Sequence, residues 1–186
     1  MSTQTFLVIG ATGKTGQHTV QHLLEKGHAV RAMVHKEDER AEALRGTGVE
    51  VVIGELLEHD DVIRAAAGAS AAYFCYPISP GLIQATAYFA DAAKRAALNV
   101  VVNMSQISAR EGSASHAARD HWIAERLFDW SGVPTVHILQ KRNRPRRCCG
   151  TCLHRRLAIS YPGDREQPRA RLFAQGRQAG LRPGRG

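Results

Sequence analysis

The chain has 186 residues, enough for one domain with a sizeable hydrophobic core. Its formal net charge is +8, but residues 1–139 carry 12 Lys/Arg against 15 Asp/Glu, a net of −3, and residues 140–186 carry 13 against 2, a net of +11. The basic character therefore belongs to the end of the chain, and the net charge does not indicate a nucleic-acid-binding surface on residues 1–139.

The sequence shows neither a membrane segment nor an export signal. No apolar run approaches the length of a membrane span, and the first residues lack the basic region that begins a signal peptide. Cys75 is the one cysteine of residues 1–139, and it falls in an apparently buried strand. We therefore expect a reducing, cytoplasmic environment and no disulfide framework.

The first predicted elements are an apolar strand over residues 5–10 and a helix over 14–26, joined by a glycine-rich turn. Each glycine has a separate use in dinucleotide binding: Gly10 permits the tight turn, Gly13 lets the backbone approach the phosphates, and Gly16 lets the helix pack on the sheet. The helix N-terminus offers free N–H groups to an anion. The predicted phosphate loop consists of Gly10, Thr12, Gly13, Lys14, Thr15 and Gly16.

Two alternatives to this interpretation of the turn remain. The triplet Gly13-Lys14-Thr15 is typical of a nucleotide-hydrolysing P-loop, but that motif needs a glycine where this chain has Val8, inside the strand. A glycine-rich turn between a strand and a helix can also occur without any ligand.

The remaining elements of residues 1–139 alternate regularly between strand and helix. Strands are predicted over 29–34, 49–53, 70–76, 99–104 and 134–139, and helices over 38–45, 58–67, 81–97 and 116–130. This alternation predicts an α/β fold, a Rossmann-type doubly wound parallel sheet. Ligands of such sheets bind at the carboxyl ends of the strands, so the residues that follow each strand are the candidate site residues.

The residues after the second strand favour NADP(H) over NAD(H). An NAD site normally has an acid here to hold the ribose 2′-hydroxyl, whereas this chain has His35 and Lys36, which suit a 2′-phosphate. The alternative is a solvated loop that is basic by chance. Glu55 and Leu56 follow the third strand and are placed to border the adenine. Tyr76 follows the fourth strand and Ser105 the fifth.

With these pieces in place, the chain resembles the NmrA-like group of atypical short-chain dehydrogenases/reductases over residues 5–139. The resemblance implies an NAD(P)H-binding oxidoreductase, such as a quinone or azo-type reductase, or a regulator that binds the dinucleotide without turning it over. It implies that His35, at a position where the group often has Arg, is the residue that selects for the 2′-phosphate. Glu55 stands at a position where the group often has Asp. The matching segments are 10–16, 30–34, 49–56, 121–126 and 131–134.

The resemblance also shows a departure at the catalytic positions. Many members of the wider superfamily use a Tyr-x-x-x-Lys pair, in which the Lys lowers the pKa of the Tyr. Aligned on Glu125, this chain has Ala117 in the Tyr position and His121 in the Lys position. The candidate catalytic residues are therefore His121 and Ser105, and His121 could donate a proton or hold the nicotinamide ribose. The alternative is a polar helix residue near the rim of the site.

Residues 140–186 depart from the family pattern, which would continue with a substrate-binding portion. They hold 12 of the chain's arginines, 4 prolines and 6 glycines, and we expect them to be disordered. We interpret them as an out-of-frame segment, since a one-base shift turns every Cys codon into Ala or Val. Two alternatives remain: half a zinc site formed by Cys149, Cys152 and His154, with Cys148 beside it, and nucleic-acid binding by the arginines through phosphates, for which aromatic residues are few.

The sequence thus predicts a dinucleotide-binding domain over 1–139 and a basic tail over 140–186. The expected function is hydride transfer from NADP(H) to a small electrophile such as a quinone, with a dinucleotide-sensing regulator as the alternative. No metal is expected. The expected partners are the dinucleotide and an unidentified small-molecule substrate, and nucleic acid only through non-specific attraction to the tail.

Overall fold

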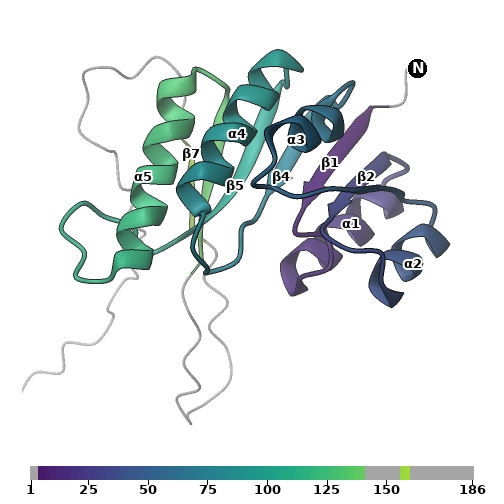
Figure 1. The fold of residues 1–186 in the computed structure, drawn as a ribbon, viewed down its shortest axis with the longest axis horizontal. Helices are drawn as coiled ribbons and strands as arrows, with labels where there is room; N and C mark the ends of the chain where they lie inside the picture. Colours follow the sequence, from purple (N-terminus) through teal and green to yellow (C-terminus); the bar gives the residue numbers. More distant parts are fainter. Residues whose placement is uncertain (1–3, 141–155, 160–186) are drawn as a thin grey trace, which may run out of the picture.

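A computed structural model describes residues 4–140 and 156–159 of the chain (Figure 1). One sheet contains strands β1 (Thr5–Ile9), β2 (Ala29–Val34), β3 (Glu50–Ile53), β4 (Ala71–Phe74), β5 (Val100–Gln106), β6 (Thr135–Gln140) and β7 (Arg156–Ile159). The helices are α1 (Lys14–Glu25), α2 (Glu39–Gly46), α3 (His59–Ala66), α4 (Leu82–Arg95) and α5 (His116–Ser131).

The strand order is β3-β2-β1-β4-β5-β6-β7, with β1 to β6 parallel to one another and β7 antiparallel to β6. The chain therefore moves outward from β1 in one direction, returns, and continues outward in the other direction. This confirms the Rossmann-type doubly wound sheet predicted from the alternation of elements. The carboxyl ends of the parallel strands form one edge, where the loops that follow β1, β2 and β4 meet.

The helices lie on both faces of the sheet (Figure 1), and one hydrophobic cluster is buried against each face. Leu7 and Ile9 of β1 point into a cluster with residues of α3, α4 and α5, while Val8 points into a second cluster with residues of α1 and α2. This is the period-2 alternation of a strand that is buried on both faces. Burial on both faces explains why the strand sequences are nearly continuous apolar runs.

Three phenylalanines form the centre of the larger cluster. Phe74 of β4, Phe89 of α4 and Phe128 of α5 are all fully buried. The ring centroids of Phe74 and Phe89 lie 4.8 Å apart, and Phe128 meets Phe74 edge-on at 5.5 Å. These contacts attach α4 and α5 to the middle of the sheet. Among the described residues, no helix is both long and apolar enough to cross a membrane.

Most of residues 140–186, including the cysteines and histidine of the alternative zinc site, lie outside the described residues. The exceptions are Gln140, which ends β6, and Arg156–Ile159, which pairs with β6 as β7. The predicted boundary after residue 139 therefore falls one residue before the end of a strand. The expectation of disorder concerns residues that the structure does not describe.

We expect Phe128→Ala to lower the free energy of unfolding by about 3–5 kcal/mol, because it leaves a cavity between two other buried rings. Trp130→Ala is the control on the same helix, since Trp130 is 72% exposed, and it should change stability by less than about 0.5 kcal/mol. Urea unfolding of the full chain followed by circular dichroism measures both. Equal losses for the two variants would contradict the packing described for α5.

Candidate dinucleotide site

The turn between β1 and α1 is built by close contacts that only glycine allows. Gly10 has φ +76°, and a Cβ there would lie 2.6 Å from the carbonyl oxygen of Cys75. A Cβ on Gly16 would overlap the carbonyl group of Gly10. The Gly13 N–H donates to the Gly10 carbonyl at 3.0 Å, and Gly13 is the N-cap of α1. The backbone of α1 therefore begins in direct contact with the end of β1.

The N-terminus of α1 has the electrostatic character of an anion site. No acidic residue lies in its first turn, and Gly13 supplies no side chain to cap the free N–H groups. Lys14 is exposed at the same end of the helix. Free N–H groups, the positive end of the helix dipole and a lysine all favour a phosphate. The residues present therefore fit a dinucleotide pyrophosphate.

Thr15 has a different environment from the rest of the predicted phosphate loop. Its hydroxyl accepts a hydrogen bond from the Tyr73 hydroxyl at 2.9 Å, and Tyr73 belongs to β4, the neighbour of β1. Burial raises the pKa of Tyr73 to about 12, so the phenol stays protonated and remains a donor. Burial likewise raises the pKa of the free Cys75 thiol beside it. Sequence reasoning missed Tyr73, which only the adjacency of β1 and β4 brings to the loop.

The two residues predicted to select the cofactor are in contact. His35 follows β2 and Glu55 follows β3, and the His35 Nδ1 lies 2.6 Å from a Glu55 carboxylate oxygen. Lys36 is exposed, and Leu56 is half-buried against the larger hydrophobic cluster. The structure thus brings His35 and Glu55 together at the carboxyl edge, and it directs Leu56 toward the protein interior.

A pocket of about 340 Å³ lies between the β4–α4 loop and the first turns of α5. Its lining is mainly apolar, and its two ionisable members are Asp120 and His121. Tyr76 is not part of the lining, because its hydroxyl donates to the Pro80 carbonyl at 3.0 Å and so closes the loop on itself. The lining residues are Pro77, Ile78, Ser79, Pro80, Leu82, Ala117, Asp120 and His121.

His121 is the predicted catalytic residue that reaches this pocket. It is only 5% exposed, and burial lowers its pKa, while the charge of Asp120 acts in the opposite direction. The imidazole is therefore held neutral near pH 7 and offers one hydrogen-bond donor and one acceptor. Ala117, one turn earlier on α5, lines the same pocket with a methyl group.

Ser105 was expected to follow the fifth strand, but it lies within β5. The strand continues to Gln106 because Ser105 and Gln106 pair with Leu139 and Gln140 of β6. Its hydroxyl is 1% exposed and donates to a Glu125 carboxylate oxygen at 2.7 Å. The pleat of the strand turns the Ser105 side chain toward α5, and its hydrogen bond is therefore with that helix.

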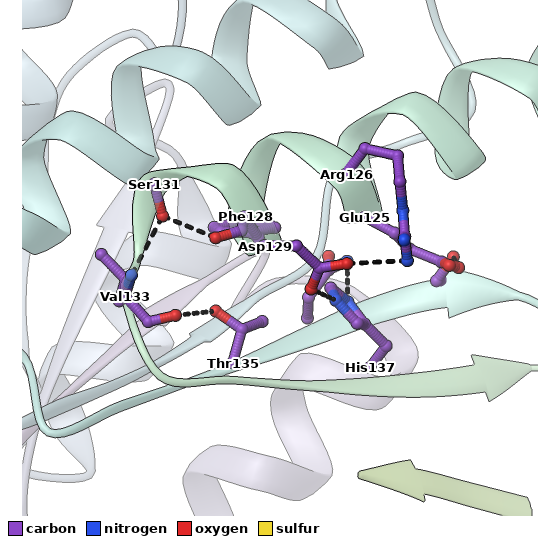
Figure 2. A network of polar contacts seen from close by, with 10 residues as sticks. Glu125, Arg126, Phe128, Asp129, Ser131, Val133, Thr135 and His137 are labelled. Carbon is purple, nitrogen blue, oxygen red and sulfur yellow. Dashed lines mark hydrogen bonds and ion pairs between the residues drawn. The ribbon is translucent and has the colours of Figure 1, made fainter. Parts of the chain in front are cut away.

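A second set of polar contacts, centred on the buried side chains of Asn103 and His137, joins α5 to β5 and β6 (Figure 2). His137 of β6 lies 3.0 Å from the Asn103 amide nitrogen and 3.4 Å from an Asp129 oxygen. Asp129 also pairs with Arg126 at 2.7 Å. Buried polar groups of this kind are satisfied only when helix and strands keep their relative positions. They hold the helix that carries His121.

Gln106 is a further polar residue at the carboxyl edge that the prediction did not include. Its side-chain amide nitrogen is buried and has no hydrogen-bond partner among the described residues. No signal in the sequence separates it from an ordinary residue at a strand end. Within the described residues, no group of three or more metal-binding side chains is present.

Comparisons with known proteins identify the class of ligand that this fold binds. A family model described as NAD(P)H-binding matches residues 10–138. Sterol demethylase protein B of Methylococcus capsulatus is 31% identical over 129 residues, which is 63% of this chain and 39% of that protein. Among solved structures, a Citrobacter sp. triphenylmethane reductase complexed with NADP(H) is 27% identical, with a TM-score of 0.63, over 71% of this chain and 48% of that chain.

The negative transcriptional regulator NmrA is a further structural neighbour, 25% identical with a TM-score of 0.66, over 73% of this chain and 45% of that chain. This chain thus spans less than half the length of the relatives it matches. The chain belongs to the NAD(P)H-binding family, and its similarity to NmrA-like atypical short-chain dehydrogenases/reductases is confirmed over part of its length. The neighbours include both reductases and a regulator.

We expect Gly16→Ala to lower both stability and dinucleotide affinity, because the new methyl group forces α1 away from the turn after β1. Overpacking of this kind costs about 1–3 kcal/mol. Gly46→Ala is the control, since a Cβ there has no neighbour within 4 Å. Urea unfolding and titration with NADP(H) measure the two effects, and equal behaviour of the two variants would contradict the close contact.

The lowered pKa of His121 predicts a pH dependence of stability. The folded chain binds this proton less readily than the unfolded chain, whose His pKa is about 6.5. The contribution to the free energy of unfolding is therefore fully present above that pH and is lost as pH falls through the folded-state pKa. Urea unfolding between pH 8 and pH 5 should show this decline in the wild type and a smaller one in His121→Asn. The exposed His18 provides the control, because His18→Asn should retain the decline.

Proposed function

We propose that the chain is an NAD(P)H-dependent oxidoreductase that transfers hydride to a small electrophile such as a quinone. The observation that carries this proposal is the pocket beside His121, which opens between the loop after β4 and the helix after β5. In a doubly wound sheet these loops lie at the ligand-binding edge, together with the phosphate loop after β1. An apolar cavity with a few polar groups suits a flat organic molecule.

Different residues at this edge would bind different parts of the dinucleotide. Gly10, Thr12, Gly13 and Lys14 would hold the pyrophosphate at the N-terminus of α1. His35 and Lys36 would meet the adenosine ribose, and their basic character favours NADP(H) over NAD(H). When bound, the dinucleotide supplies the hydride, and its nicotinamide end would extend toward the pocket.

The protein's own contribution to the reaction would come mainly from His121. Its neutral imidazole can donate a hydrogen bond to the oxygen of a carbonyl or quinone and so orient the electrophile. The apolar wall formed by Ile78, Leu82 and Ala117 would exclude water from that oxygen. The likeness to the triphenylmethane reductase makes cationic dyes a second group of electrophiles to test, and Asp120 provides a carboxylate in the same pocket.

A dinucleotide-sensing regulator is the second candidate function. The likeness to NmrA favours it, as does the methyl group of Ala117 in place of a catalytic phenol. For either function we propose a cytoplasmic location, supported by the free Cys75 and the dinucleotide-binding fold. We also propose that contact with nucleic acid is restricted to non-specific attraction by residues 140–186, whose net charge is +11.

The test is oxidation of NADPH, followed at the nicotinamide absorbance, with a panel of quinones and triphenylmethane dyes. We expect turnover in the wild type and a loss of about 10²-fold in kcat/KM for His121→Asn, with the NADPH dissociation constant little changed. His18→Asn, on the exposed face of α1, is the matched control. Tight NADPH binding without turnover would favour the regulator, and absence of nucleotide binding would contradict both functions.

A further inference from the structure

The ends of β2 and β3 lie side by side, and each is followed by a charged side chain. Val34 is in register with Ile53, and the Gly54 N–H donates to the Val34 carbonyl at 3.0 Å. This pairing brings His35 and Glu55 together across the strand ends, with 2.6 Å between the imidazole nitrogen and the carboxylate oxygen. The contact is therefore set by the register of the sheet.

The backbone that carries Glu55 is also fixed by α3. The Glu55 N–H donates to an Asp61 carboxylate oxygen at 2.9 Å, and Arg64 pairs with the same carboxylate at 2.7 Å. Both contacts hold the pKa of Asp61 below its ordinary value, so it remains an acceptor. A Cβ on Gly54 would lie 3.0 Å from the side chains of Asp61 and Met33, which leaves this turn little room to move.

The two acidic residues that directly follow Lys36 are paired with arginines. Glu37 forms an ion pair with Arg45, and Asp38 pairs with Arg40 at 2.7 Å. Among the described residues, Lys36 has no ion-pair partner. The charge that a ribose 2′-phosphate would meet is therefore decided by Lys36, His35 and Glu55.

Resting on the proposed function, we propose that Glu55 is a specificity-determining residue that acts through His35 and lowers the preference for NADP(H). The Glu55 carboxylate offsets any positive charge on His35, so the contacting pair lacks the permanent positive charge that an arginine would offer a 2′-phosphate. The pair leaves one imidazole nitrogen and one carboxylate oxygen for a ligand. The carboxylate accepts the 2′-hydroxyl of NAD(H) and opposes a phosphate at the same place. The site consequently accepts both dinucleotides, and Lys36 supplies the remaining preference.

The test is the ratio of NAD⁺ to NADP⁺ dissociation constants, measured by calorimetry at fixed pH and salt. We expect E55Q to raise this ratio in favour of NADP⁺ by about two- to fivefold, the range typical of one exposed ion pair. The same change should appear with adenosine 2′,5′-bisphosphate against AMP, which lack the nicotinamide. A purely structural role of Glu55 would weaken all four ligands alike.

Two further variants separate the routes by which Glu55 could act. E58Q removes an exposed carboxylate three residues away and should leave the ratio unchanged. In an H35Q background, E55Q should have less effect than in the wild type. An unchanged or reversed ratio in E55Q, an equal effect of E58Q, or an undiminished effect in the H35Q background would overturn the inference alone. Absence of binding of either dinucleotide to the wild type would overturn the proposed function with it.

Discussion

The cofactor end of this molecule depends on the contact between Gly16 of α1 and the carbonyl group of Gly10. No side chain fits between the helix and the turn, so α1 begins against the end of β1 and its free N–H groups face the carboxyl edge of the sheet. The positive φ of Gly10 makes the reversal possible. The hydrogen bond from Tyr73 to Thr15 then attaches the first turn of the helix to β4. The anion-binding character of this end of α1 thus follows from backbone packing more than from charged side chains.

Much of the fold could be predicted because its signals are local. Apolar runs such as Val100–Val102 mark strands that are buried on both faces, and the Gly10–Gly16 spacing marks the turn that begins the first helix. The end of β5 shows where local signals fail. Ser105 and Gln106 are polar, so the sequence placed them in a loop, yet pairing with β6 keeps them in the strand. Such an extension is decided by a neighbour more than thirty residues away in sequence.

The candidate site likewise combines features that local sequence predicts with contacts that depend on distant segments. The predicted phosphate loop is a continuous segment, and the spacing of its glycines is enough to predict the turn. His35 and Glu55 were each identified from their place after a strand, but their contact depends on the register of β2 with β3. Tyr73 and the bond from Ser105 to Glu125 depend on which elements are neighbours in space. Sequence reasoning therefore found the residues of the carboxyl edge better than it found their partners.

Helix α5 carries both the residues that form polar contacts with the sheet and two residues that line the pocket. Glu125 meets Ser105 one turn after His121. One turn later, Asp129 meets His137 (Figure 2). Both contacts lie on the face of the helix that meets β5 and β6, so they fix its rotation as well as its position. That rotation brings Ala117 and His121 to the pocket together. The small side chain of Ala117 leaves space in the pocket, and the imidazole of His121 borders that space. The one histidine of the pocket lining thus has its position set by contacts further along the same helix.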